Sequence, residues 1–270
     1  MKPVRVVVLI VGCMVALAPI VWHILSSLKT ADEILNIPPT LFPHTPTIAN
    51  YVELFRRRPF LRYALNSFTI ASLASLTCVF AASLASFPLA RSSPRIRRSV
   101  TSSLLVLSFF PPIVFLLPLY EFVRAVRLVN QPWGLILPYA GMNLPLAVWL
   151  LTGYFERIPV ALDEAGAIDG LTPLQTYIRI ILPISVPAMV SALILVFVFS
   201  WNEFMLALTF INSEQAKTIT LGVSTLSGAL AYDIPYGLLA AGVVASSAPL
   251  VLLVLLFQRK IVAGLSQRAG

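Results

Sequence analysis

The sequence predicts an all-α membrane protein built from six transmembrane helices. Its 270 residues are 58% hydrophobic and 11% charged, whereas soluble domains contain about 25% charged residues. Six segments each run for about 20 residues with almost no charge, which is the length that a helix needs to cross the hydrocarbon core of a bilayer. One long polar segment, residues 155–186, separates the fourth of them from the fifth. We expect a single transmembrane domain over residues 1–270.

The six spans are expected at about 6–27, 67–90, 99–122, 134–154, 187–211 and 234–258. Asn66-Ser67 can cap the second span, because short polar side chains accept hydrogen bonds from the free amides of a first helical turn. In the third span, Pro111, Pro112 and Pro118 predict a kink or an unwound stretch, since each proline removes a helical hydrogen bond.

The first apolar segment follows Lys2 and Arg5 and has a competing interpretation as a cleaved signal peptide. The apolar part of a signal peptide is about 7–15 residues long, which is shorter than the run over residues 6–25. Cleavage after Ala18 would also place Pro19 next to the scissile bond. An uncleaved first span is therefore favoured.

Charge indicates the orientation of the spans, which place both termini on the same side of the membrane. With the N-terminus in the cytoplasm, inner segments hold 11 of the 19 Lys and Arg residues and outer segments hold 8, as the positive-inside rule favours. The cluster Arg91–Arg98 agrees, with four arginines and no acid, whereas the run Arg56–Arg58 opposes it. Because the bases flank apolar spans, anionic lipid headgroups account for the net charge of +8 better than nucleic acid does.

The first half of the polar segment predicts a short helix. Pro159 suits a first helical position, and the acids Asp163 and Glu164 suit the positive end of the helix dipole. Gly170 provides a C-terminal stop. The apolar positions of this helix are Val160, Leu162, Ala165 and Ile168.

The second half predicts another helix, which starts with a capping box formed by Thr172 and Gln175 around Pro173. Its apolar positions fit the template of an amphipathic helix: Leu174, Tyr177, Ile178, Ile181 and Leu182. Leu182-Pro183 is expected to end it before the fifth span. We therefore expect a helix–turn–helix on the membrane surface, with its acids available to a partner in water and its apolar stripes packed on the bundle. The alternative is an ordinary interfacial loop with solvated acids.

The chain shows no sign of covalent chemistry. It contains no G-x(4)-G-K-[ST] phosphate loop, so it does not bind ATP in that way itself. Paired acids, a His/Cys metal cluster and a nucleophile–base arrangement are also missing, because His23 and His44 are isolated and both cysteines lie in apolar segments. We expect a protein that is not an enzyme and that holds no metal or cofactor of its own.

A signature in the polar segment points to a family. Glu164-Ala165-Gly166, Asp169-Gly170 and Ile180-x-Leu182-Pro183 resemble the EAA signature of ABC importer permeases, E-A-A-x(3)-G-x(9)-I-x-L-P. Nine residues separate Gly170 from Ile180, as the signature requires. Gly166 stands where the second alanine is usual, and we expect it to loosen the first helix slightly.

The resemblance extends over nearly the whole chain and is to the maltose-type, carbohydrate-specific group of these permeases. The matching pieces occur in the group's order: Asn50-Tyr51, Asn66-Ser67, Ala90-Arg91, Trp201-Asn202-Glu203-Phe204 and the tail Phe257–Leu265. Each piece is a weak signal, but in order around the EAA spacing they are a strong one.

The resemblance implies a MetI-like permease fold in a bacterial or archaeal cell membrane, with cytoplasmic termini. The implied partners are a second homologous permease, two copies of a cytoplasmic ATPase that binds ATP and Mg²⁺, and an extracytoplasmic sugar-binding protein. The polar segment would dock as a coupling helix into a groove on the ATPase, with Glu164 paired to a basic residue there. The implied coupling residues are Glu164, Ala165, Gly166, Asp169, Gly170, Leu182 and Pro183.

Asn202 and Glu203 are polar residues inside the fifth span, where a carboxylate is costly unless it faces water or a partner. Beside the aromatic ring of Trp201, they are candidates to line a sugar path. Asn143 of the fourth span is a further candidate, with its neighbours Tyr139 and Trp149. The alternative is a structural contact to a neighbouring helix, or a wet position near the interface.

Two other functions remain open at this point. An ABC importer permease for another polar solute, such as a glycerol-phosphate, would share all these features. A secondary transporter would need inverted repeats or convergent buried carboxylates, and Glu203 is the only acid deep in an expected span.

Overall fold

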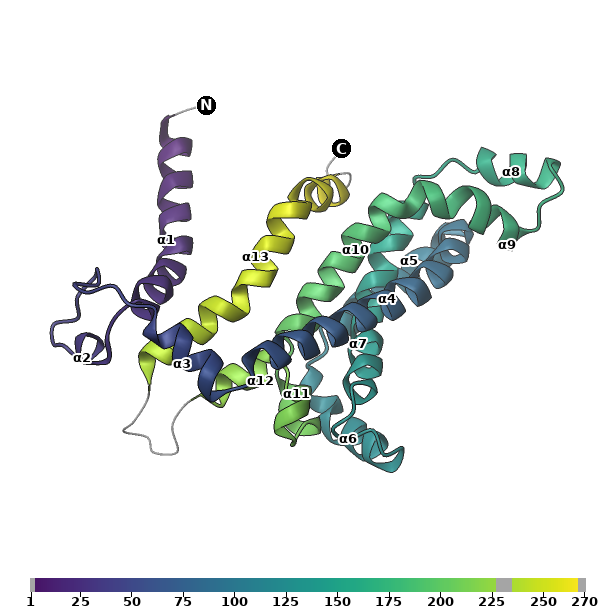
Figure 1. Ribbon diagram of the computed structural model, residues 1–270. Helices are drawn as coiled ribbons and strands as arrows, with labels where there is room; N and C mark the ends of the chain where they lie inside the picture. The colour runs from purple at the N-terminus through teal and green to yellow at the C-terminus, as the bar shows by residue number, and fades with distance from the viewer. Residues whose placement is uncertain (1–2, 227–234, 267–270) are drawn as a thin grey trace. The chain divides into compact units, whose positions relative to one another are not determined.

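The computed structural model describes residues 3–226 and 235–266, and every regular element in these ranges is helical (Figure 1). The α-helices are α1 (Pro3–Ser27), α2 (Ala31–Ile34), α3 (Ala49–Arg57), α4 (Phe60–Arg91), α5 (Pro94–Ser108), α6 (Leu116–Ala125), α7 (Trp133–Phe155), α8 (Ala161–Ile168), α9 (Pro173–Thr176), α10 (Leu182–Asn202), α11 (Met205–Phe210), α12 (Ile219–Ser224) and α13 (Tyr236–Ser266). Two 3₁₀ turns, η1 (Pro112–Phe115) and η3 (Glu214–Ala216), and one π-helical turn, η2 (Tyr177–Ile181), complete them. The all-α fold class is confirmed.

Within the described residues, five helical stretches are long and apolar enough to cross a membrane, and a sixth is present if the bent pair α5 and η1–α6 counts as one span. The two arms of that pair are bent by 84°. The break lies at Pro111, which is extended, and Pro112, which starts η1. The kink expected in the third span is therefore confirmed, and its cause is the loss of helical hydrogen bonds at consecutive prolines. Of the expected sixth span, Ile234 lies outside the described residues, as do the side chains from position 258 onward.

The fifth span differs from the expectation at both ends. Leu182-Pro183 does not end a helix, because α9, η2 and α10 form one helical stretch from Pro173 to Asn202. The Leu182 amide donates to the carbonyl of Tyr177, five residues back, and this wide turn relieves the clash that Pro183 would cause in an α-helix. At the other end, Glu203 interrupts the span and the short helix α11 follows.

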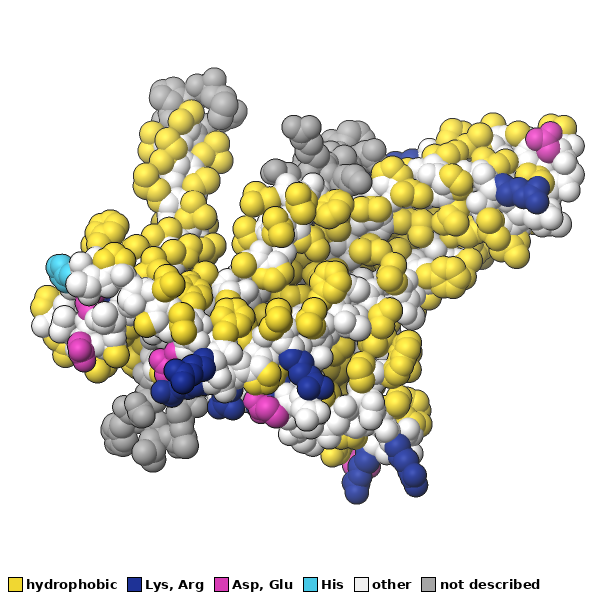
Figure 2. Space-filling model, in the orientation of Figure 1, with side chains coloured by type: hydrophobic (Ala, Val, Ile, Leu, Met, Phe, Trp, Pro, Cys, Tyr) yellow, Lys and Arg dark blue, Asp and Glu magenta, His cyan; other side chains and the backbone are white. Residues whose placement is uncertain are grey.

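The chain divides into two compact units: Met1–Leu65 with Lys217–Leu253, and Asn66–Ala216 with Val254–Gly270. The single domain expected over residues 1–270 stays a prediction. Figure 2 shows hydrophobic side chains over most of the visible surface of the long helices, with charged side chains gathered at helix ends and connections. That distribution is typical of helices that face lipid.

In the first unit, a buried carboxylate orders the proline-rich connection between α1 and α4. Glu33 accepts hydrogen bonds from the His44 amide and from the Thr40 hydroxyl, each at 2.9 Å. The Lys29 ammonium donates to the carbonyl of Thr40. The Asn50 amide donates to the carbonyls of Ser27 and Lys29, both at 2.9 Å, and so holds α3 against the end of α1.

Acid is expected to weaken this connection. The His44 amide, and then the Thr40 hydroxyl, lower the pKa of Glu33 below its ordinary value of 4.5. The resulting stability is fully present above about pH 4.5 and is lost as pH falls through the lower pKa of the folded protein. The difference in Tm between the wild type and Glu33→Gln should therefore shrink as pH falls below about 4.5. A difference that grows on acidification would contradict the assignment.

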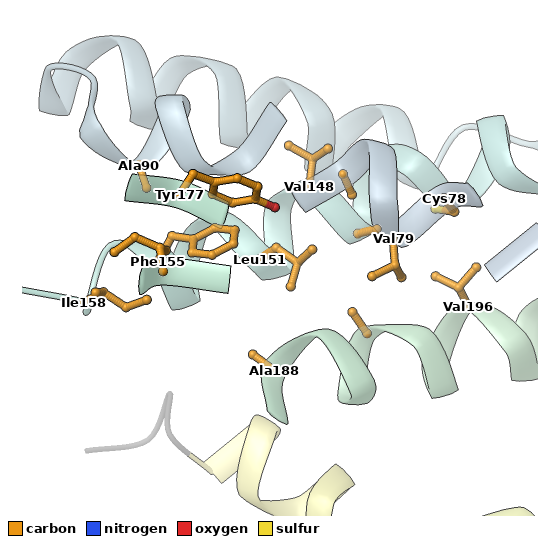
Figure 3. Close-up of a cluster of buried hydrophobic side chains, with 14 of the residues drawn as sticks. Cys78, Val79, Ala90, Val148, Leu151, Phe155, Ile158, Tyr177, Ala188 and Val196 are labelled. Carbon is orange, nitrogen blue, oxygen red and sulfur yellow. The ribbon is translucent and has the colours of Figure 1, made fainter. Parts of the chain in front are cut away.

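The core of the second unit joins α4, α7, η2 and α10 (Figure 3). Phe155 and Tyr177 lie beside one another there, followed along the helices by Leu151 and Val148. The Tyr177 hydroxyl contacts the Ser83 hydroxyl at 2.9 Å, which satisfies both buried groups. This core therefore anchors the last turn of the polar segment to two membrane helices.

Candidate functional site

The polar segment contains the two expected helices, although the second continues into the fifth span. α8 begins at Ala161, two residues after Pro159, and has Asp163 and Glu164 in its first turn. Gly170 has φ of +75°, a conformation that favours glycine. The Leu171 amide donates to the Gly166 carbonyl at 2.9 Å, and the Gly170 amide to the Ala167 carbonyl at 3.1 Å. These are the two bonds of a Schellman motif, so the expected C-terminal stop is confirmed.

The second helix begins with the expected capping box. The Thr172 hydroxyl accepts from the Gln175 amide at 3.3 Å, and the Gln175 side chain accepts from the Thr172 amide at 2.9 Å. Pro173 takes the first helical position, where its missing N–H leaves no bond unmade. Residues in or next to the turn therefore cap both α8 and α9, without help from distant parts of the chain.

Gly166 has a packing role that the sequence did not reveal. It is buried, and a Cβ added there would lie 2.6 Å from the Thr176 Oγ1 atom and 2.9 Å from its Cγ2 atom. Thr176 is itself buried, with 4% exposure. The glycine therefore lets α8 approach α9 closely, rather than only loosening its own helix.

This close approach gives a testable substitution. Gly166→Ala is expected to lower the free energy of unfolding by about 1–3 kcal/mol, as overpacking does in other cores. Adding Thr176→Ala removes both nearest atoms and should restore much of the loss, which a Tm series on the purified protein would show. Gly141→Ala is the control, because a Cβ there meets nothing within 4 Å. Equal effects of the 141 and 166 substitutions would contradict the packing role.

Two of the acids form ion pairs within this chain. Asp163 pairs with Arg91 at the end of α4, with 2.5 Å between Oδ2 and Nε, and Glu156 pairs with Arg97 of α5 at 2.7 Å. The expectation that the acids are available is therefore wrong for Asp163, whereas the Glu156 side chain stays 48% exposed. The sequence showed both partners, since Arg91 and Arg97 belong to an arginine cluster without acids, but it did not show their pairing.

Glu164 and Asp169 remain exposed, and no residue in the described ranges forms an ion pair with either of them. Glu164 and Ile168 are four residues apart, so they share one face of α8. The Ile168 side chain is 86% exposed. This face therefore offers a carboxylate and a large apolar side chain together, while Asp163 and Gly166 hold the opposite face in place.

Some apolar residues of the segment pack on the core of the second unit, and others are exposed. Tyr177 and Ile181 are buried in the core, and Leu162 and Leu182 are partly buried against it, as expected. The expected packing on the bundle is wrong for four others, which are at least half exposed: Val160, Ile168, Leu174 and Ile178. The periodicity identified the helices, but it could not say that one side would be left without a partner in this chain.

The four residues proposed to line a solute path lie in different environments, some buried and some exposed. The Glu203 carboxylate accepts from the Tyr139 hydroxyl at 2.6 Å and from the amides of Leu206 and Ala207 at 2.8 and 3.2 Å. Trp201 is 3% exposed and stacks on Phe197 with 5.7 Å between ring centroids. These contacts favour the structural interpretation for both residues.

The two asparagines are less enclosed. Asn202 is exposed, and its amide donates to the Val198 carbonyl at 2.8 Å. The Asn143 amide donates to the Tyr139 carbonyl at 2.8 Å, one turn along α7. Asn143 and Glu203 thus both contact Tyr139, while a lining role for the set stays a prediction.

Known proteins resemble this chain over nearly its whole length. The family described as "Binding-protein-dependent transport system inner membrane component" matches residues 74–267. The chain is 35% identical to the sulfoquinovosyl glycerol transport system permease of Agrobacterium fabrum, over 98% of this chain and 92% of that protein. It is 37% identical to the trehalose/maltose transport system permease of Thermococcus litoralis, over 97% and 96%, and 35% identical to the trehalose transport system permease of Mycobacterium tuberculosis, over 94% and 92%.

A solved structure has the same fold. It is the crystal structure of a bacterial ABC transporter involved in the import of the acidic polysaccharide alginate. One of its chains superposes with a TM-score of 0.79, at 18% identity, over 95% of this chain and 94% of that chain. The likeness extends over both units of the chain.

Proposed function

Because this chain belongs to the family of inner-membrane components of binding-protein-dependent transport systems, we propose that it forms half of the translocation pathway of an ATP-driven sugar importer. It is a permease subunit and not an enzyme. The sugar class rests on relatives named for trehalose, maltose and sulfoquinovosyl glycerol. A permease for another polar solute, such as a glycerol-phosphate, is the second candidate.

The observation that carries the proposal is the exposed face of α8. A helix of eight residues is fixed to this chain on one side by Asp163 and Gly166, and presents Glu164 and Ile168 on the other. The sequence has no phosphate loop, so the energy must enter from another protein. An apolar side chain next to a carboxylate fits a groove that has an apolar floor and a basic rim.

The proposed partners follow from the proposal that the energy of ATP enters this chain through α8. Two copies of a cytoplasmic ATPase bind ATP and Mg²⁺, a second homologous permease completes the pathway, and an external binding protein delivers the sugar. α8 and both chain termini lie on the cytoplasmic side of the cell membrane. When ATP draws the two ATPases together, the groove carries α8 with it and biases the bundle between inward-facing and outward-facing states. Such a bias requires that the ATPase contact α8 differently in the two states.

The continuous helix from Pro173 to Asn202 supports this mechanism. A displacement of α9 reaches the fifth span along one continuous helix, and α8 is joined to α9 by a short capped turn. Secondary transport is less well supported, because Glu203 is already engaged by Tyr139 and by the first turn of α11. A coupling-ion site would need that carboxylate for the ion.

The contact with the ATPase is tested by Ile168→Asp. Burying a charge in an apolar groove should weaken the contact by at least about 1.4 kcal/mol, or tenfold, and so reduce the ATPase that co-purifies with the permease. Ile37→Asp is the matched control, since Ile37 is 96% exposed in the connection between α1 and α4. Full co-purification of the ATPase with Ile168→Asp would contradict the proposed role of α8.

A further inference from the structure

We propose that Arg91 is a positioning residue that makes the inner end of α4 move together with α8, so that the second span responds to the ATPase directly. The proposal rests on the proposed function, in which α8 receives the displacement. It gives the displacement of α8 a second path into the bundle, in addition to the continuous helix from α9 into α10. The residues that carry it all belong to the second unit of the chain.

Arg91 joins three elements at one point. It is the last residue of α4, and its Nε atom donates to Asp163 in the first turn of α8. Its Nη1 atom donates to the Phe155 carbonyl, at the end of α7, at 3.0 Å. The guanidinium carbon also lies 5.5 Å from the centre of the Phe87 ring, one turn back along α4. A planar cation with several donors in fixed directions suits such a junction.

The aromatic residues around Arg91 hold it to the rest of the core. The ring of Phe87 lies 5.2 Å from that of Tyr177 and 6.0 Å from that of Phe155, measured between centroids. Figure 3 shows Phe155 and Tyr177 packed between the helices, close to Ala90 near the end of α4. Arg91 is thus held in place by Phe87 and the aromatic rings behind it. A displacement of Asp163 would therefore be transmitted through Arg91 to α4.

The ion pair matters because it joins α8 to α4 directly. α8 packs on α9 and η2, and an open cavity of about 820 Å³ lies between the α8–α9 turn and the inner ends of α4 and α5. Arg91 and Asp163 lie in the wall of this cavity, together with Phe87, Ala167 and Thr176. Their ion pair therefore bridges a region that is not filled by packed side chains.

The pair is also partly protected from water, which sets it apart from surface pairs. The side chains of Arg91 and Asp163 are 19% and 24% exposed, against 70% and 40% for Arg57 and Glu53 on α3. Exposed pairs contribute little to stability, whereas low solvation strengthens the attraction between charges. Among the described residues, Arg91 Nη2 and Asp163 Oδ1 have no hydrogen-bond partner. Each side chain therefore keeps one buried polar atom that can take a further hydrogen bond.

Arg97 does not serve the same purpose. Its partner Glu156 follows the last residue of α7, so that pair fastens α5 to α7 and does not reach α8. The two pairs have similar N–O distances, 2.5 and 2.7 Å, but different positions. Breaking the second pair is therefore a matched control for breaking the first.

The test measures whether α4 and α8 move as one body in the complete importer. Nitroxide labels are placed on Ser93→Cys, just beyond α4, and on Ala161→Cys, at the start of α8; both positions are exposed. Cys13→Ser removes the exposed native thiol, and Cys78 is buried. The distance between the labels is compared without nucleotide and after trapping with ATP and vanadate.

In the wild type, and in Glu156→Gln, the label distance should be the same in both states. In Asp163→Asn it should change on trapping by about 2 Å or more, which is the scale of helix shifts in switching proteins, and Asp163→Glu should restore the wild-type result. A lost fold alone would not produce a difference that depends on nucleotide. If Asp163→Asn keeps one distance in both states, or if the wild type changes as much as Asp163→Asn does, the inference is overturned. The proposed function fails separately, when Ile168→Asp leaves the ATPase attached.

Discussion

Replacing Glu203 by alanine is expected to destabilise the permease by about 3 kcal/mol or more, because each unpaired buried donor costs about 1–3 kcal/mol. The substitution leaves the Tyr139 hydroxyl and the amides of Leu206 and Ala207 without their carboxylate partner. Tyr139 is 2% exposed, so water cannot easily take that place. The Tm of the purified importer should fall clearly, and its yield should fall with it.

A double substitution separates this structural role from a role in transport. Tyr139→Phe removes one of the three donors, so Glu203→Ala in that background should cost less than in the wild type, as expected for groups in direct contact. Glu121→Ala provides the control, because Glu121 is 70% exposed on α6. If Glu203→Ala assembles at the wild-type Tm and only uptake is lost, the carboxylate lines the solute path and the structural interpretation is wrong.

Glu164→Lys is expected to abolish most ATP-driven uptake while the permease itself still folds. Glu164 is exposed and makes no ion pair with the described residues, so within this chain its reversal only removes a favourable charge from the first turn of α8, which costs about 0.3–1 kcal/mol. Against a basic residue of the ATPase, a like charge replaces an attraction, and a change of about 1–3 kcal/mol corresponds to a 5–150-fold loss of coupling. Uptake into proteoliposomes, measured with the complete importer, checks this.

Glu121→Lys is the matched reversal for that experiment, because it places the same new charge on an exposed position of α6. It should leave uptake unchanged. Should Glu164→Lys support uptake at the full rate with the ATPase attached, the coupling depends on the apolar contact of Ile168 instead. That outcome would distinguish the role of Glu164 from that of Ile168.

The sequence predicted the local structure of the polar segment well, because local chemistry decides it. Thr172, Gln175 and Gly170 act on backbone groups within a few residues, so their roles could be recognised without any tertiary contact. The end expected at Leu182-Pro183 was wrong for the opposite reason. Whether a proline ends a helix depends on what holds the chain on either side, and here the burial of Tyr177 and Ile181 keeps it helical.

The pairing of charges could not be predicted, because it depends on distance in space. Arg91 and Asp163 are 72 positions apart in the chain, and the arginine cluster looked equally suited to lipid headgroups. Glu203 was recognised as costly inside a span, which is a property of the residue alone. Its partner Tyr139 was proposed only for the wall of the solute path, since nothing in the sequence aligns the fourth span with the fifth.

The wide turn at Tyr177–Ile181 also sets the phase of the helix that contains it. An α-helix advances by about 100° per residue, so side chains four apart drift by about 40° around its axis. The wider π turn reduces that drift between Tyr177 and Ile181, which lie on the same buried side of the helix as Ser185, Ala188 and Ala192. One buried stripe therefore runs from the polar segment into the fifth span. The angular setting of α9 about the α10 axis depends on this wide turn.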